Sequence, residues 1–212
     1  MSVPQAASSG AAPIARDSLM PVDDSALDLL FRDARTPARW TGEPVSEETL
    51  RVLYDLLKIA PTSGNCSPGR FVFLTTQDAK ERLRPALSEG NVEKALAAPV
   101  VVIVAHDPLF FDQLSRLNPE PDLRSWFAAD VGLSEETAFR NGSLQGAYLI
   151  LAARALGLDA LPMSGFDGAL VEDTFLAGEG WRANFLVCLG HGEPLDTPRA
   201  ARLQFDEACR LL

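Results

Sequence analysis

The chain has 212 residues, of which 47% are hydrophobic, and it carries a formal net charge of −10 at neutral pH. This length suits one domain with a hydrophobic core of its own. Because an acidic surface repels phosphate backbones and anionic lipids, and no apolar run is long enough to cross a bilayer, neither nucleic acid nor a membrane is expected as a partner.

Residues 1–20 are rich in Ala, Ser, Gly and Pro and lack the basic start and unbroken apolar stretch of a secretory signal. This composition predicts a disordered tail, followed by a single domain over residues 21–212. The three cysteines, Cys66, Cys188 and Cys209, have no metal-ligand spacing. Reduced thiols in a cytoplasmic protein, and no metal site, are therefore expected.

The first predicted helix begins after Ser46, which is suited to be its N-cap, and the acids that follow favour the positive end of the helix dipole. Leu50, Leu53 and Leu57 are spaced to form its buried stripe, and Pro61 marks its end.

Four apolar runs further along predict strands, and the run at 100–105 has no alternation, which is typical of a strand buried on both faces. The predicted strands are 70–74, 100–105, 160–163 and 184–189. Further helices are predicted over 78–87, from Ser134 to Leu156 with a stop at Gly157, and from Asp167 to about Phe175. The segment 107–130 is interpreted as a loop or lid. The predicted fold class is α+β, with a central mixed sheet of about four to five strands flanked by long helices.

Side chains for acid–base catalysis are scarce. The two histidines, His106 and His191, each follow a predicted strand, where an isolated histidine is more often structural than catalytic. Cys66 has no partner base nearby in the sequence, and the chain has neither a phosphate-binding loop nor a dinucleotide motif. This pattern favours chemistry carried out by an organic cofactor.

Three segments combine polar donors in a way that suits a ligand, although each alone is compatible with an ordinary turn or a solvated surface. Residues 60–65 pack two hydroxyls, a glycine and an amide between a helix and a strand. Residues 162–167 lead from a strand into a helix N-terminus, where free backbone N–H groups favour electron-rich atoms. Arg199 and Arg202 are a pair of cations suited to a phosphate.

In this order, these segments resemble the nitroreductase family over about residues 28–212. The matching segments are 35–36, 40–45, 60–68, 89–91, 98–101, 155–158 and 162–167. The resemblance implies a nitroreductase-like fold, a homodimer, FMN as cofactor, NADPH or NADH as hydride donor and a small-molecule substrate. Ala34, Ala38 and Gly69 depart from the family pattern, in which basic residues and a Trp are common at these positions.

The resemblance also implies roles for individual residues. Arg35 and Thr36 would meet the FMN phosphate and ribityl chain, and Arg199 and Arg202 would close on the phosphate. Asn91 would hydrogen-bond the flavin ring. The flavin N5 region would be faced by backbone groups at the end of a strand, namely those of Pro162, Met163, Ser164 and Gly165. A loop of the partner subunit would complete the site with Pro61, Thr62, Ser63 and Asn65. No catalytic side chain is required.

Within the family, the segments 33–36, 61–68, 82–88, 124–127, 135–141 and 162–167 are similar to the malonic semialdehyde reductases of the Rut uracil-degradation pathway. The implied reaction is reduction of 3-oxopropanoate to 3-hydroxypropanoate. Arg124 or Arg140 would bind the substrate carboxylate, near Trp126 and Phe127. Three alternatives stay open: a broad nitro- or quinone reductase, a non-catalytic flavin-binding protein, and a hydrolase that uses Cys66.

Overall fold

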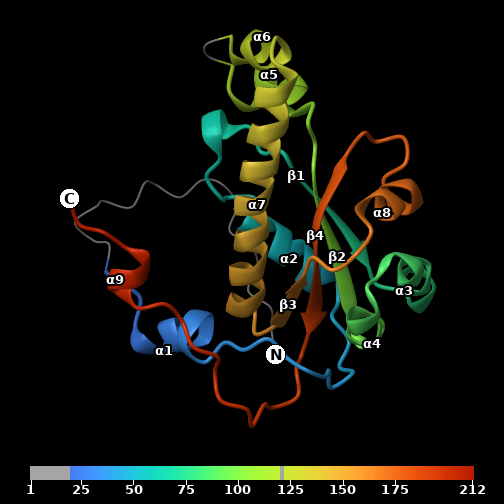
Figure 1. Ribbon diagram of the computed structural model, residues 1–212, viewed down its shortest axis with the longest axis vertical. Helices are drawn as coiled ribbons and strands as arrows, with labels where there is room; N and C mark the ends of the chain where they lie inside the picture. Colours follow the sequence, from blue (N-terminus) through green and yellow to red (C-terminus); the bar gives the residue numbers. More distant parts are fainter. Residues whose placement is uncertain (1–19, 120–121) are drawn as a thin grey trace.

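The computed structural model describes residues 20–119 and 122–212, so the predicted tail, apart from Met20, lies outside the described residues. The described chain forms three layers, in which a sheet lies between two groups of helices (Figure 1). Helices α2 and α7 pack on one face of the sheet, and α3, α4 and α8 pack on the other. The predicted α+β class is confirmed.

The sheet has four strands in the order β1-β2-β4-β3. They span Gly69–Leu74 (β1), Val100–His106 (β2), Asp159–Met163 (β3) and Arg182–Gly190 (β4). All four predicted strands are present, and β2 is buried along its whole length, as predicted. The predicted mixed sheet is wrong, because each neighbouring pair is antiparallel. The physical reason lies in the connections. The chain returns from β1 to the adjacent β2, and from β3 to the adjacent β4, in the opposite direction each time. The connection from β2 to β3 passes over the position of β4, so these two strands are not neighbours.

One face of the sheet is covered by α2 (Glu47–Leu57) and α7 (Val131–Ala155). The side chain of Ser46 accepts the N–H of Thr49 as the predicted N-cap, and the stripe of Leu50, Leu53 and Leu57 is buried. Helix α7 begins earlier than predicted, because Asp130 caps it through the N–H of Leu133. Ser134 is buried instead, with its hydroxyl donating to the carbonyl of Pro108.

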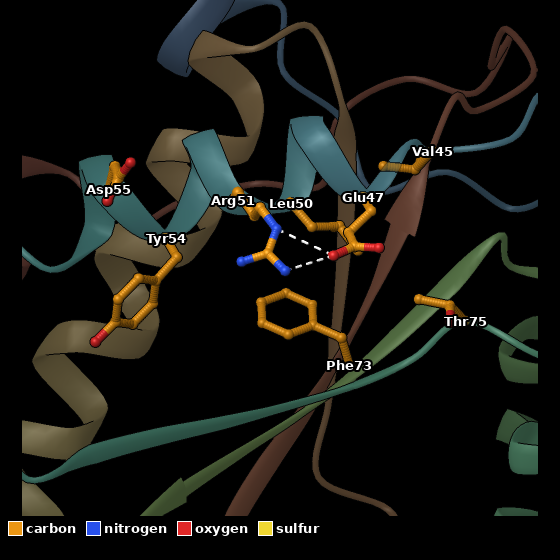
Figure 2. Close-up of a pocket in the computed structure, with 8 residues that line it drawn as sticks. All are labelled: Val45, Glu47, Leu50, Arg51, Tyr54, Asp55, Phe73 and Thr75. Atoms are coloured by element: carbon orange, nitrogen blue, oxygen red, sulfur yellow. Dashed lines mark hydrogen bonds and ion pairs between the residues drawn. The ribbon is translucent and has the colours of Figure 1, made fainter. Parts of the chain in front are cut away.

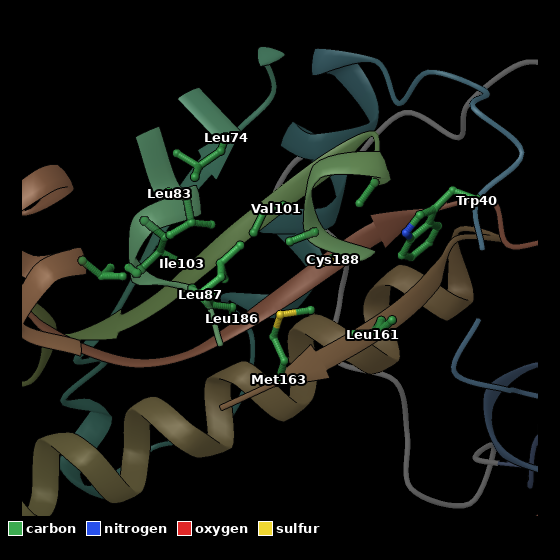
Figure 3. Packing of buried hydrophobic residues seen from close by; sticks show 14 residues of the cluster. Trp40, Leu74, Leu83, Leu87, Val101, Ile103, Leu161, Met163, Leu186 and Cys188 are labelled. Carbon is green, nitrogen blue, oxygen red and sulfur yellow. The ribbon is translucent and has the colours of Figure 1, made fainter. Parts of the chain in front are cut away.

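The other face is covered by α3 (Gln77–Leu83), α4 (Glu89–Ala97) and α8 (Gly168–Phe175), the last capped by Asp167 as predicted. The expected helix over 78–87 is shorter, because a 3₁₀ turn at Arg84–Ala86 follows α3. Sequence analysis assigned no helix to α4. Figure 3 shows the core of this layer, in which side chains of β2, β3 and β4 meet those of the helices.

The segment 107–130 is not an open loop. Its described residues form a 3₁₀ turn at Phe110–Gln113 and two short helices, α5 (Leu114–Leu117) and α6 (Leu123–Ala128). Phe110, Leu114 and Phe127 are buried with Cys66 and Ala138 in a separate small core. Phe110 and Phe127, two of the aromatics of the predicted loop or lid, therefore attach this segment to the first half of α7.

Short helices lie near both ends of the described chain: α1 (Asp24–Leu27), a π-helical turn at Asp28–Arg32, and α9 (Phe205–Ala208). Figure 1 shows α1 and α9 on the same side of the molecule. Among residues 20–119 and 122–212, no helix combines the length and the apolar character needed to span a membrane.

Candidate functional site

The first candidate cluster joins the start of α4 to the loop after β3; we call it the Asn91–Gly165 cluster, formed by Ser88, Asn91, Ser164 and Gly165. The amide Nδ2 of Asn91 and the backbone N–H of Ser88 both donate to the carbonyl of Gly165, each at 3.0 Å. A Cβ on Gly165 would lie 2.7 Å from Asn91 Nδ2 and 3.1 Å from Ser88 Oγ. Only glycine therefore permits this close approach.

The strand β3 determines which groups near this cluster are available. Met163 is buried in the core, so its side chain cannot contribute to a ligand site, whereas Pro162 and Ser164 on either side of it are exposed. This alternation is that of a strand with one buried face. Pro162 is tolerated because β3 is at the edge of the sheet. Ser164 and Gly165 therefore follow the last strand residue at an accessible edge.

A second cluster, which we call the arginine corner, contains Arg35, Arg154 and Arg199. The guanidinium of Arg199 donates to the carbonyls of Arg32, at 2.5 Å, and Ala34, at 2.9 Å. Arg35 donates in return to the carbonyl of Thr197 at 3.0 Å. The structure thus brings together two of the arginines predicted to bind phosphate, although they are 164 positions apart in the sequence.

Two other predicted phosphate ligands are less engaged. Among the described residues, the guanidinium of Arg202 donates only to the carbonyls of Ala200 and Ala201, close to it in the chain. Thr36 is exposed beside Arg35. Arg154, by contrast, was not identified from the sequence, where it is simply a cation in the last turn of a helix. It belongs to the corner because its Nη1 donates to the carbonyl of Leu30, two residues before the carbonyl of Arg32 that Arg199 holds.

The third candidate segment, the loop 61–65, lies apart from both clusters. The N–H of Ser63 donates to Asn141 Oδ1 of α7 at 2.9 Å, and Asn65 Nδ2 donates to the carbonyl of Leu117 in α5 at 2.8 Å. Gly64 and Asn65 adopt positive φ angles of 56° and 53°, which glycine and asparagine tolerate best. None of the hydrogen bonds that this loop makes to described residues reaches either cluster.

In this loop, Pro61, Ser63 and Asn65 are exposed, and Thr62 is half-buried. The hydroxyl of Thr62 accepts the N–H of Ser67, which shapes the turn into β1. These hydrogen bonds therefore hold in place a loop of which most residues are exposed.

The predicted substrate residues lie on α6 and α7. Arg124 forms an ion pair with Asp112 at 2.7 Å, and its guanidinium lies 6.0 Å from the ring centre of Phe111. Arg140 pairs with Glu136 one turn earlier on α7. Trp126 is 57% exposed, whereas Phe127 is 3% exposed and packs edge-on against Phe110. Phe127 is thus a core residue with no free face for a substrate, which corrects its predicted role.

Cys66 and His106, two of the catalytic candidates from the sequence, are buried. Cys66 is fully buried, and this burial raises the pKa of its thiol to about 11, against the smaller effect of a hydrogen bond from Thr62. A thiol that stays protonated is a weak nucleophile. His106 is also buried, which lowers its pKa, and its Nε2 lies 3.8 Å from Glu135. The residues that the structure describes contain no group of three potential metal ligands.

A cleft of 640 Å³ lies between α2 and β1, as Figure 2 shows. It is lined by Val45, Glu47, Leu50, Arg51, Tyr54, Asp55, Phe73 and Thr75. Nε of Arg51 donates to Glu47, one turn earlier on α2, at 3.0 Å. No predicted site residue lines this cleft, so it is separate from the candidate site.

The model of the Nitroreductase family matches residues 33–191. A protein of Burkholderia lata, named as an NADH dehydrogenase/NAD(P)H nitroreductase, is 58% identical over 191 residues, which cover 90% of this chain and 98% of the relative.

Solved structures show the same fold. A nitroreductase of Bacillus subtilis superposes with a TM-score of 0.79 at 21% identity, covering 89% of this chain and 99% of that one. A nitroreductase of Exiguobacterium sibiricum, solved in complex with FMN, superposes with a TM-score of 0.77 at 19% identity, covering 92% and 99%. At these identities, the likeness establishes the architecture.

Proposed function

The chain belongs to the nitroreductase family, and from this we propose that it is an FMN-dependent oxidoreductase that uses NADH or NADPH to reduce a small organic acceptor. The name of the Burkholderia lata relative supports NAD(P)H as reductant, and the complex of the Exiguobacterium sibiricum protein supports FMN. When bound, FMN would supply the hydride-transfer chemistry that the side chains of this chain lack.

The Asn91–Gly165 cluster fits the polar edge of a flavin ring, and this observation carries the proposal. Nδ2 of Asn91 is used by Gly165, which fixes the orientation of the amide. Its Oδ1 remains as an acceptor, and the exposed backbone of Ser164 beside it provides a donor. Since a side chain at position 165 would collide with Asn91, the backbone itself is the surface offered to the ring.

The arginine corner fits the phosphate end of FMN. Arg35 and Arg199 are tied to backbone carbonyls, and neither has a carboxylate in ion-pair distance among the described residues. Their positive charge therefore stays available for an anion, and charge-assisted hydrogen bonds to phosphate are strong. Between the corner and the Asn91–Gly165 cluster runs β3, whose five residues span about 17 Å at the usual strand rise. An elongated ligand with one phosphate suits this spacing.

The loop 61–65 supports a homodimer as the functional unit. Its exposed polar groups would complete the flavin site only if a second copy supplies them, because its hydrogen bonds anchor it to α5 and α7 of its own chain. Pro61, Thr62, Ser63 and Asn65 of each copy would then serve the site of the other. A two-fold axis would create two equivalent sites.

For the acceptor, we propose 3-oxopropanoate, reduced to 3-hydroxypropanoate with one hydride from NAD(P)H and one proton from solvent. The support is the resemblance in the segments around Arg124 and Arg140, since a buried carboxylate needs a cation. A broad nitro- or quinone-reductase activity is the second candidate. It is favoured by the exposed ring of Trp126 and by the acids that already engage Arg124 and Arg140.

One set of measurements tests both levels of the proposal. The purified protein should be yellow, and heat should release a flavin that chromatography identifies as FMN. A protein that is colourless and does not bind added FMN would overturn the cofactor assignment. Steady-state turnover of 3-oxopropanoate, compared with nitrofurazone and menadione, then decides the acceptor. A clear preference for either aromatic compound would favour the second candidate.

A further inference from the structure

Arg154, the member of the arginine corner that lies in the last turn of α7, contacts the segment that leads to Arg35. Its Nη1 donates to the carbonyl of Leu30 at 2.9 Å, and its side chain is partly buried. The residue comes from the central helix of the fold, whereas Arg35 and Arg199 come from segments near the chain ends. Arg154 is therefore the only one of the three whose backbone belongs to a long helix packed on the sheet.

The three arginines form a connected set of hydrogen bonds. Arg154 holds the carbonyl of residue 30, Arg199 holds those of residues 32 and 34, and Arg35 holds that of residue 197. The segment 30–35 is thus held by four hydrogen bonds, one to α7 and three to the segment after β4. Without the bond from Arg154, the hydrogen bonds that join this segment to later parts of the described chain would all go to residues 197 and 199.

The arrangement brings Arg199 close enough to Arg154 for the two positive charges to interact, in a region that also contains Asp33 and Asp159. Burial lowers the pKa of Arg154, and the neighbouring charge of Arg199 lowers it further. Two like charges near each other are unfavourable unless the structure places an anion beside them. No ion pair within 4 Å relieves any of the three among the described residues.

Arg154 itself faces acids rather than open solvent. A cavity of 150 Å³ beside it is also lined by Asp33 and Asp159, and the second of these accepts the N–H of Gly192. Arg154 is partly buried and its Nη1 already holds the carbonyl of Leu30, so it is better placed to hold the segment that carries Arg35 than to bind the phosphate itself.

We propose that Arg154 is a positioning residue for phosphate recognition: it fastens the segment 30–35 to α7 so that Arg35 and Arg199 present their guanidinium groups together. The inference rests on the proposed function, because it takes the phosphate of FMN as the ligand. Substitution of Arg154 should therefore change the affinity for a flavin that carries the phosphate, and not the affinity for the flavin ring itself.

The test compares the dissociation constants of the apoprotein for FMN and for riboflavin, which has the same ring and no phosphate, together with thermal unfolding of each apoprotein. Arg154→Met should weaken FMN binding about tenfold, corresponding to the loss of one charge-assisted hydrogen bond. Riboflavin affinity should stay within about twofold, since the ring site is intact. Arg154→Lys keeps a cation that can reach Leu30 and should restore most of the loss.

Arg82→Met is the matched control, because Arg82 also donates to a backbone carbonyl, that of Thr174, at 2.9 Å. It should leave the ratio of FMN to riboflavin affinity unchanged. If Arg154→Met leaves that ratio unchanged, or weakens both ligands equally as the protein loses thermal stability, the positioning role is overturned. If the wild-type protein binds FMN no better than riboflavin, the proposed phosphate site fails first, and the inference fails with it.

Discussion

The side-chain amide of Asn91 donates to the carbonyl of Gly165 over 3.0 Å, and so joins two segments that lie 74 residues apart in the sequence. This bond brings the first turn of α4 against the loop after β3. Ser164, next to Gly165 in this loop, is exposed. Every part of the proposed ring site depends on this approach.

Gly165→Ala should disrupt that approach, because the added Cβ would lie 2.7 Å from Asn91 Nδ2. We expect FMN affinity to fall about tenfold or more, since the hydrogen bond from Asn91 Nδ2 to Gly165, which orients the amide, would be disrupted. Fluorescence titration of the apoprotein with FMN measures the change. Gly168→Ala is the control, because its Cβ would meet nothing closer than Phe166 at 4.0 Å. Equal affinity in the two variants would remove this glycine from the proposed site.

The two arginines near the C-terminus should differ in importance. Arg199 holds carbonyls of the segment 32–34, whereas Arg202 bonds only to its immediate neighbours. Arg199→Ala should therefore weaken FMN binding about tenfold to a hundredfold, and Arg202→Ala clearly less. Equilibrium dialysis of the two variants compares them directly. A larger loss at Arg202 would mean that the segment after Arg199 rearranges when the phosphate binds.

Local signals explain which parts of the fold could be predicted. Ser46 and Asp167 cap α2 and α8 through bonds within one helical turn, and Gly157 ends α7 with a φ of 77°. These features depend on a few adjacent residues, so the sequence is sufficient to find them. The uninterrupted apolar run of β2 is equally local.

Helix α4 was missed because it is held mainly by distant residues. It buries only Ala95 and contains Gly90, so its apolar pattern is weak. Nζ of Lys80 donates to the carbonyls of Leu96 and Ala98 at its C-terminal end, and Trp40 Nε1 donates to that of Lys94. No pattern within residues 89–97 contains this information. For the same reason, the resemblance identified Asn91 although the helix that carries it was not predicted.

The role of Arg124 tests the proposed substrate. Its guanidinium pairs with Asp112 at 2.7 Å, so a substrate carboxylate would have to replace that acid. If Arg124 binds the carboxylate of 3-oxopropanoate, Arg124→Ala should reduce kcat/KM for this substrate by about tenfold or more. Turnover of neutral menadione should hardly change. Asp112→Asn provides a second arm, because releasing Arg124 should improve kcat/KM for 3-oxopropanoate only. Equal losses for both acceptors would indicate a structural role.

The cysteines should differ in reactivity with iodoacetamide. Burial raises the pKa of Cys66 to about 11 and that of Cys188 to about 12, whereas Cys209 is exposed. At pH 8 both buried thiols are protonated as well as inaccessible, so the folded protein should gain one label and the denatured protein three. Intact-mass spectrometry counts the labels. Rapid labelling of Cys66 in the folded protein would reopen the hydrolase alternative.

If each flavin site is built from both chains of a dimer, mixing two defective variants should restore FMN binding at some sites, which a site built from one chain would not allow. Ser63 is exposed and lies on the loop that would reach the partner's flavin, whereas Gly165 belongs to the site of its own chain. Ser63→Trp should block the partner's site by its bulk, and Gly165→Ala should damage the site of the chain that carries it. Each variant alone should therefore give dimers that bind little FMN.

In a heterodimer of the two variants, one site receives both substitutions and the other receives neither. After unfolding and refolding an equal mixture, random pairing makes about half of the dimers mixed, so about a quarter of all sites should bind FMN with wild-type affinity. Titration of the mixture with FMN, beside each variant refolded alone, measures this fraction. If the mixture binds no more FMN than the two variants do separately, then each site is built from one chain and the loop 61–65 has another role.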